Sequence, residues 1–131
     1  PYSALPDSVI ASEASDFSCY VIIDNTNGKS ALSFDSSINI HGQYVSAPPK
    51  QIELGQQGKF WLQDYAGLVG SEGSVTYLAE SQSLKLTYTC PTSWFNSCSG
   101  ANFYTSNDGI NWGELNQVKE RGHPFFVKFI L

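Results

Sequence analysis

Hydrophobic and polar residues alternate along most of the chain, a pattern typical of β-strands that bury one face. The clearest runs lie at 17–24, 84–89 and 125–131. Shorter β-prone runs lie at 30–34, 38–44, 51–55, 60–65 and 75–78, followed by a hairpin signal at 103–112. The only helix candidate, 114–121, offers just Leu115 and Val118 to a core. The pattern therefore predicts an all-β protein.

Length and turn spacing favour one domain. A chain of 131 residues lies in the commonest size range of single domains and can bury one core. Residues 1–15 lack sustained periodicity, which predicts an extended N-terminal arm, and residues 16–131 form the domain. About eight to ten short strands separated by turn signals predict an antiparallel β-sandwich or a flattened β-barrel.

Glycines predict how neighbouring strands pair. Asn27-Gly28 is a favoured two-residue hairpin turn, so 30–34 is expected to return as the antiparallel partner of 17–24. A second glycine-rich corner separates the aromatic run 60–65 from 75–78, which is expected to pair back on it as a hairpin. This corner holds Gly67, Gly70 and Gly73. These glycines shape a turn in the favoured interpretation, and in the alternative they let a ligand approach the backbone.

Charge and composition limit the partners. The net charge is −5 and the sequence pI is near 4.7, whereas nucleic-acid binding needs a basic footprint. Anionic membranes are disfavoured for the same reason, while neutral lipids remain possible. No apolar run reaches membrane-spanning length. The sequence begins with Pro, and we expect its secretory leader to have been removed. We therefore expect a processed, secreted, extracellular protein.

Three cysteines leave the disulfide pattern open. Cys90 and Cys98 flank a seven-residue segment and are expected to close a small surface loop, with Cys19 as a buried thiol. The rival pairing joins Cys19 to Cys90 across adjacent strands.

The catalytic inventory is thin. His41 and His123 have no spacing that a metal or a nucleophile requires, and His123 precedes Pro124 as a turn or strand-start residue. Nothing singles out Asp64 and Glu72 as an acid and base pair. The stretch 24–28 lacks the spacing of a calcium loop. We predict no catalytic residue, no metal and no cofactor, and an enzyme is the last of the alternatives.

Aromatic residues are plentiful, with 8 Phe, 7 Tyr and 3 Trp, so some are expected at the surface. Trp94-Phe95 is the best case, since two neighbouring bulky rings in a closed loop do not both point inward easily. Exposed aromatic pairs are typical of sites that contact a lipid interface, a sugar or a protein partner. The alternative is that the loop folds back over the core. The predicted ligand-binding residues are Trp94, Phe95, Tyr65, Trp61 and Trp112.

A short motif surrounds the last of these tryptophans. Thr105, Asn107, Gly109 and Trp112 resemble the Asp-box pattern found on hairpins of many secreted and glycan-handling proteins. Asp108-Gly109 makes the turn in this interpretation, and the tryptophan folds over it. Such a turn is structural even in proteins that bind sugars.

The middle two-thirds of the chain resembles the aegerolysin group, small acidic fungal and bacterial β-sandwich proteins. The resemblance rests on Val21-Ile-Ile-Asp-Asn-Thr26, Gly42, Pro49, Phe60, Gly67, Gly70-Ser-Glu-Gly73, Val75, Tyr77, Leu86, Tyr88, Cys90-Pro91 and Asn96. Beyond Asn96 the sequence departs from the pattern, and the N-terminal arm is extra. Aegerolysin-like proteins bind membrane lipids without catalysis, sometimes with a pore-forming partner. The resemblance implies that the loop aromatics bind lipid here.

A weaker similarity is to thaumatin-like β-sandwiches, carried by Ile23-Asp-Asn-Thr26 and Ile52-Glu-Leu-Gly-Gln56 but without their dense disulfides. Composition also resembles small secreted fungal effectors, including elicitors that plant cells perceive. Three hypotheses follow in descending order. The first is a secreted effector or toxin-like protein that binds a lipid or receptor on a target cell. The second is a glycan-binding or enzyme-inhibiting module, and the third is an enzyme.

Overall fold

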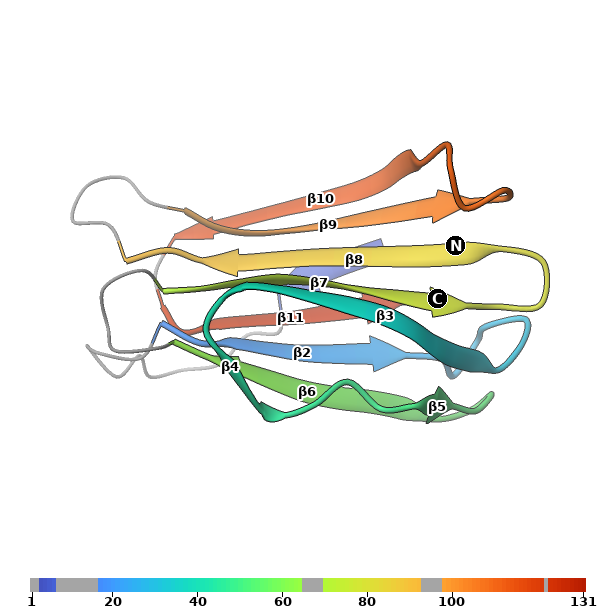
Figure 1. The fold of residues 1–131 in the computed structure, drawn as a ribbon, viewed down its shortest axis with the longest axis horizontal. Coiled ribbons are helices and arrows are strands. Elements are labelled where there is room, and N and C mark those ends of the chain that lie inside the picture. The colour runs from blue at the N-terminus through green and yellow to red at the C-terminus, as the bar shows by residue number, and fades with distance from the viewer. Residues whose placement is uncertain (1–2, 7–16, 65–69, 93–97, 122) are drawn as a thin grey trace.

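The computed structural model describes residues 3–6, 17–64, 70–92, 98–121 and 123–131, with backbone only at 3–6, Cys98 and Arg121. Regular structure in these residues consists of β-strands alone, as predicted. They form the two sheets of a β-sandwich (Figure 1). No helix in the described ranges is long and apolar enough to cross a membrane.

Each sheet has its own strand order. Sheet A runs β1 (Ser3–Pro6), β11 (Phe125–Ile130), β2 (Cys19–Asp24), β6 (Gln57–Gln63) and β4 (Gln43–Ser46). Sheet B runs β10 (Gly113–Arg121), β9 (Cys98–Ser106), β8 (Ser83–Cys90), β7 (Ser71–Leu78), β3 (Leu32–His41) and β5 (Gln51–Ile52). Neighbouring strands are antiparallel except β11 and β2, which are parallel.

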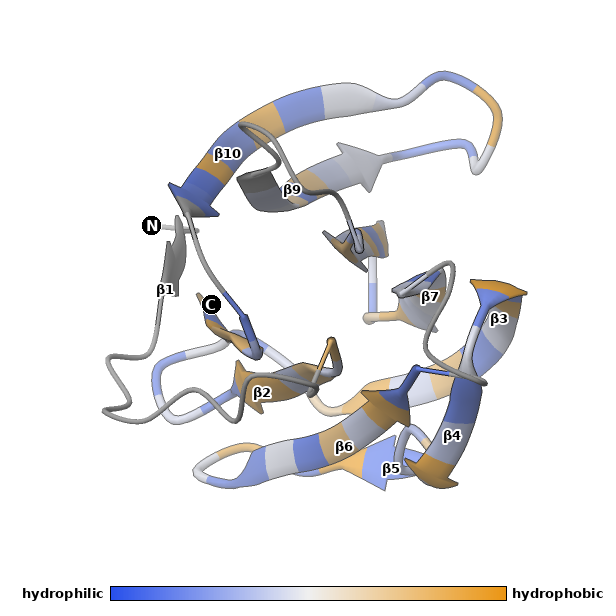
Figure 2. Ribbon diagram, turned by 90° about the vertical axis from the view of Figure 1, so that its left-hand side faces the viewer, coloured by the Kyte–Doolittle hydropathy of each residue, from blue (hydrophilic) through white to orange (hydrophobic). Residues whose placement is uncertain are grey.

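The core lies between the sheets and follows the period-two pattern. Buried and partly buried residues alternate strictly along β2, β8 and β11, so one face of each strand points inward. Aromatic rings bridge the two layers. The ring centroids of Phe60 and Tyr88 lie 5.5 Å apart, and those of Phe103 and Phe129 lie 5.9 Å apart. Figure 2 views the two layers along the strands, with β1 lying near β10.

The hairpin predicted at Asn27-Gly28 is wrong. Residues after the turn enter β3 in sheet B, whereas β2 pairs with β6 and β11 in sheet A. The reason is Asn25, whose backbone N–H donates to Gln56 O and whose C=O accepts from Gly55 N, each at 2.9 Å. These bonds tie the chain after β2 to the turn before β6, so it crosses to the other sheet.

The hairpin predicted across the glycine-rich corner is also wrong. β6 lies in sheet A between β2 and β4, while β7 lies in sheet B between β3 and β8. Neither strand has a free edge for the other, so the segment between them connects the two sheets. Ser71 instead pairs with Cys90 at the start of the β7–β8 ladder.

Two further segments differ from the sequence-based expectation. The helix candidate 114–121 forms most of β10, since Val118 is buried against β9 and its neighbours are exposed. Within the predicted arm, Ser3–Pro6 forms β1 at the edge of sheet A, paired with β11. This strand is held by backbone hydrogen bonds to β11, so it forms without the apolar alternation by which a strand is recognised in the sequence.

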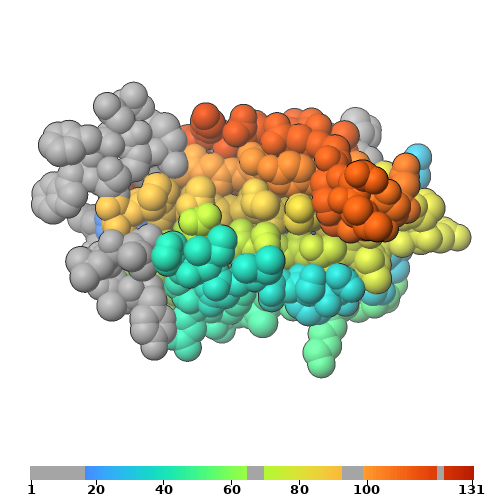
Figure 3. All heavy atoms as spheres, turned by 45° about the horizontal axis from the view of Figure 1, so that its top comes forward, coloured from blue at the N-terminus to red at the C-terminus, as the bar shows by residue number. Residues whose placement is uncertain are grey.

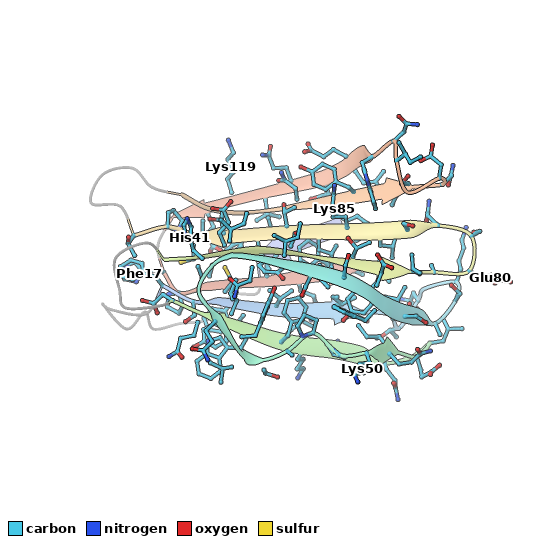
Figure 4. The ribbon with its side chains drawn as sticks, in the orientation of Figure 1. Phe17, His41, Lys50, Glu80, Lys85 and Lys119 are labelled. Atoms are coloured by element: carbon cyan, nitrogen blue, oxygen red, sulfur yellow. The ribbon has the colours of Figure 1, made fainter. Side chains whose placement is uncertain are left out.

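The sandwich has two ends, which Figure 4 marks by labelled residues. Phe17 and His41 lie at one end, called the Phe17 end, where β6 and β8 finish and β7 and β9 begin. Glu80 lies at the other, the Glu80 end, with the β7–β8 turn.

Buried tyrosines make the fold sensitive to high pH. The hydroxyls of Tyr44 and Tyr88 share a hydrogen bond near the Phe17 end, and Tyr77 OH donates to Pro49 O at 2.6 Å. Burial raises the pKa of Tyr88 and Tyr77, with the neighbouring Tyr44 hydroxyl adding to both, and burial also raises the pKa of Tyr44.

We expect the free energy of unfolding to fall as the pH rises above about 10. Above this pH the tyrosines of the unfolded chain lose their phenolic protons, whereas the buried tyrosines of the folded protein keep theirs. The stabilisation is therefore fully present below pH 10 and falls above it, by about 1.4 kcal/mol per pH unit for Tyr88 alone. Urea titrations from pH 8 upward measure this, and the Tyr44→Phe/Tyr88→Phe variant should show a shallower loss. Ionisation of every tyrosine near pH 10 in the folded protein would contradict it.

Candidate functional site

Three aromatic side chains form a row across the outer face of sheet A. Tyr20 of β2 pairs in register with Trp61 of β6 on one side and with Phe126 of β11 on the other. The ring centroids of Tyr20 and Trp61 lie 5.1 Å apart, and those of Tyr20 and Phe126 lie 4.5 Å apart with nearly parallel planes. We call Tyr20, Trp61 and Phe126 the aromatic row.

The row is partly exposed because of the strand alternation. The chain neighbours on each strand point into the core, where Val21, Phe60 and Phe125 are at most 3% exposed. The rings of the aromatic row therefore face outward and stack on one another rather than on the opposite sheet. Stacked aromatics on a solvent-facing sheet keep apolar area available to a ligand.

A shallow hollow of about 320 Å³ lies over the row. The residues around it are Tyr20, Val21, Ile22, Ser46, Lys59, Phe60, Trp61 and Phe126. Its lining is mostly apolar, with Ser46 and Lys59 as the polar side chains. The indole Nε1 of Trp61 is buried, and no acceptor among the described residues takes its hydrogen bond.

The next row toward the Glu80 end carries positive charge. Ile22 pairs with Lys59 on one side and Lys128 on the other, so two ammonium groups flank one isoleucine. The pKa of Asp24 is lowered mainly by the hydrogen bonds from Thr26, with the charge of Lys128 as a smaller cause. Sheet A thus presents an aromatic row beside a basic row, although the whole chain is acidic.

The structure places the predicted ligand-binding residues unequally. Trp61 belongs to the aromatic row, two positions before the end of β6. Tyr65, Trp94 and Phe95 lie outside the described residues. The strand ends nearest to these residues in the sequence lie at the Phe17 end of the sandwich. There Ser71, at the start of β7, pairs with Cys90, at the end of β8.

Trp112 lies elsewhere. It follows the β9–β10 turn on sheet B, where Lys85 Nζ sits 4.4 Å from its ring centroid and 5.3 Å from that of Tyr104. The structure therefore does not bring Trp112 together with Trp61.

Sequence reasoning missed Tyr20 and Phe126. Both occupy the more polar face of alternating strands, and the signal that identifies them is an aromatic residue on that face. In 17–24 and in 125–131 apolar residues stand on both faces, which marks these two strands as partly apolar on the outer face as well as on the inner one.

The turn at Asp108-Gly109 is confirmed as a structural element. Asp108 Oδ1 accepts hydrogen bonds from the backbone N–H groups of Ile110 and Asn111 at 2.8 Å and from Ser106 Oγ. The backbone bond from Asn111 is the largest cause of the strongly lowered pKa of Asp108. Gly109 adopts a φ of 74°. The Asp108 carboxylate therefore stabilises the turn through these hydrogen bonds.

The cysteine pairing stays a prediction. Cys19 and Cys90 are buried, and Cys19 Sγ lies 3.3 Å from Ser71 Oγ. Residues 93–97 and the side chain of Cys98 lie outside the described part of the chain. His123 precedes β11, as expected of a strand-start residue, and its ring centroid lies 4.1 Å from that of Phe17. Across the ranges that the structure describes, no group of three His, Cys, Asp or Glu side chains is placed to hold a metal ion.

Comparison with known proteins gives a likeness of fold. No family model matches the chain, and no curated protein matches it in sequence. Among solved structures, the fold is similar to that of the lipid-binding protein Nakanori, with a TM-score of 0.53 over 86% of this chain and 69% of that one. The likeness shows a shared β-sandwich fold. Sequence identity is 12%, so the aegerolysin resemblance remains a prediction at the level of family.

Proposed function

We propose that the protein is a secreted, non-catalytic effector or toxin-like protein that binds membrane lipid on a target cell. The observation that carries this is the aromatic row on the outer face of sheet A, partly exposed and lying beside the basic row. The fold likeness to a lipid-binding protein supports the proposal, as does the aegerolysin resemblance. Tyr65, Trp94 and Phe95, which lie outside the described residues, belong to the same proposal as predicted lipid contacts.

The two rows suit the two layers of a membrane interface. Tryptophan and tyrosine favour the region between acyl chains and headgroups, because their rings are apolar and carry one polar atom. Lysine reaches phosphate while its methylene stem covers apolar surface. With the Phe17 end toward the bilayer, the aromatic row meets the interface and Lys59 and Lys128 stand one row behind it, at the level of headgroup phosphates.

Net charge decides between lipid classes. The chain carries a net charge of −5, and Lys59 and Lys128 provide only local attraction. Since charges separated by more than about 8 Å are largely screened at physiological salt, two lysines contribute little at long range. We therefore expect zwitterionic phosphatidylcholine to be bound through apolar contact, without a need for anionic lipid.

The first test removes one ring from the row. Trp61→Ala should weaken binding to phosphatidylcholine vesicles by about tenfold or more, because about 1.5 to 3 kcal/mol of apolar burial is lost. Co-sedimentation with vesicles measures the affinity, and circular dichroism checks the fold. Trp112→Ala is the matched control, since it removes the same side chain from sheet B. Equal loss in both variants would contradict a site on sheet A.

A second variant tests Trp94 and Phe95. Replacing Trp94 and Phe95 together by Ala should remove on the order of 2 to 4 kcal/mol of binding. Unchanged vesicle binding in this folded variant would show that the loop pair is not part of the site. Binding to intact cells with no affinity for vesicles would point to a protein receptor instead, and hydrolysis of the lipid would replace the proposal by an enzyme.

A further inference from the structure

We propose that the outer face of sheet B binds a neutral oligosaccharide, at a site distinct from the aromatic row. A groove of about 610 Å³ lies over β7, β8 and β9, with β3 and β10 along its two sides. Figure 3 looks toward this face, where the blue-green atoms of β3 and the red-orange atoms of β10 lie on either side of the yellow and orange atoms of β7, β8 and β9. The aromatic row lies on the opposite face of the sandwich.

The floor of the groove is set by the register of the strands. One row of outward side chains crosses the sheet through paired positions, namely Ile38, Ser74, Thr87, Asn102 and Gln117. The next row toward the Phe17 end contains Glu72, Thr89, Gly100 and Lys119. Gly100 has no side chain, so the floor is open at its centre.

The floor has hydroxyl groups that make no side-chain hydrogen bond to other described residues. Within the part of the chain that the structure describes, no side-chain hydrogen bond engages the hydroxyls of Ser74, Thr87 and Thr89. Asn102 Nδ2 donates to Tyr104 OH at 2.9 Å, which fixes the amide and leaves its carbonyl oxygen to accept. Each hydroxyl can donate one bond and accept two. Strands lie about 4.8 Å apart, so these groups repeat across the groove at that interval.

Apolar side chains form one wall. Ile38 is 61% exposed and Ile40 is 54% exposed, and both belong to β3. A sugar ring has hydroxyls at its edge and C–H groups on its face, so it can hydrogen-bond to the floor while its face contacts these isoleucines. Isolated exposed isoleucines are ordinary, but two beside a hydroxyl-lined groove match that amphipathic ligand.

The same groups disfavour other ligands. An acyl chain would remove water from the threonine and serine hydroxyls without replacing its hydrogen bonds, which costs free energy. A phosphate-rich polymer would be repelled by Glu72 in the groove and by the net charge of −5 on the protein. The charges of Glu72 and Lys119 are opposite and cancel in the groove, so the binding of a neutral ligand has the smallest electrostatic cost.

Titration of the ¹⁵N-labelled protein by NMR tests the proposal. The probes are laminarihexaose, cellohexaose, chitohexaose and mannohexaose, with a neutral (Gly-Ser)₄ peptide for comparison. At least one oligosaccharide should give saturable shifts at the backbone amides of Thr87, Gly100 and Asn102. Thr87→Val keeps the side-chain shape and removes the hydroxyl, and it should weaken that binding by about tenfold. Thr76→Val, an equivalent change on β7 outside the groove, should leave it unchanged.

Several outcomes overturn the proposal. These are the absence of saturable binding by all four oligosaccharides, shifts confined to sheet A, equal affinity in Thr87→Val and Thr76→Val, or equal binding of the peptide. Trp61→Ala should retain oligosaccharide binding, and Thr87→Val should retain vesicle binding. The two proposals therefore succeed or fail separately.

Discussion

Replacing Gly70 by Ala should destabilise the protein by about 3 kcal/mol or more. Gly70 has a φ of +73°, a conformation that L-residues with side chains rarely adopt. A Cβ at this position would lie 2.1 Å from the backbone oxygen of Cys90 and 3.0 Å from Pro91 Cα. Because backbone atoms form the obstacle, no side-chain rotation relieves the clash, and the start of β7 must shift away from the end of β8.

Gly109→Ala is the matched control for this experiment. Gly109 has a φ of +74°, and a Cβ there would have no atom within 4 Å. This variant suffers the backbone strain alone, at about 1 to 2 kcal/mol. Urea denaturation followed by tryptophan fluorescence gives both values. The difference between the two variants measures the clash at Gly70, and equal destabilisation would show that Gly70 has free space around it.

Replacing Asn25 by Ala should cost about 3 to 5 kcal/mol of stability. Asn25 is fully buried, and its Nδ2 donates to Ser30 O at 3.0 Å and to Ile52 O at 3.1 Å, with Glu53 O at 3.3 Å. Without the amide these carbonyl oxygens lose their donor in a buried corner. Each unsatisfied group costs about 1 to 3 kcal/mol.

Two variants refine this prediction. Asn27→Ala changes the same residue type at an exposed position of the same turn and should alter stability by about 0.5 kcal/mol or less. Asn25→Asp should be at least as damaging as Asn25→Ala at neutral pH, because a carboxylate would face three carbonyl oxygens. Thermal unfolding of the three variants gives their order. A stable Asn25→Ala protein would mean that the corner is held by its backbone hydrogen bonds alone.

The role of Asn25 also explains why local turn chemistry misled the strand pairing. Asn27-Gly28 favours a hairpin on its own, but the hairpin would compete with the bonds that Asn25 makes to the β5–β6 segment. Gly28 accommodates these bonds, since a Cβ there would lie 1.8 Å from Asn25 Oδ1. The glycine therefore serves a crossing between sheets rather than a hairpin turn.

The sequence by itself determined which faces are buried and which turn is structural. Alternation is a property of each strand alone, because successive side chains point to opposite sides whatever the neighbour is. The inward positions of 19–24, 84–89 and 125–131 and the Asp108-Gly109 turn follow from local information. The all-β class follows from the same pattern.

Only the tertiary structure decided which strands are neighbours, and so which outward residues meet. Pairing depends on the closure of long loops and on how buried side chains fit across the core, and neither is encoded in the period of a single strand. Tyr20, Trp61 and Phe126 come from three distant strands and become one row through the β6–β2–β11 register. The polar row through Thr87 and Asn102 arises in the same way from β7, β8 and β9. Both proposed sites are products of register, because residues remote in sequence are placed side by side only when their strands share a ladder.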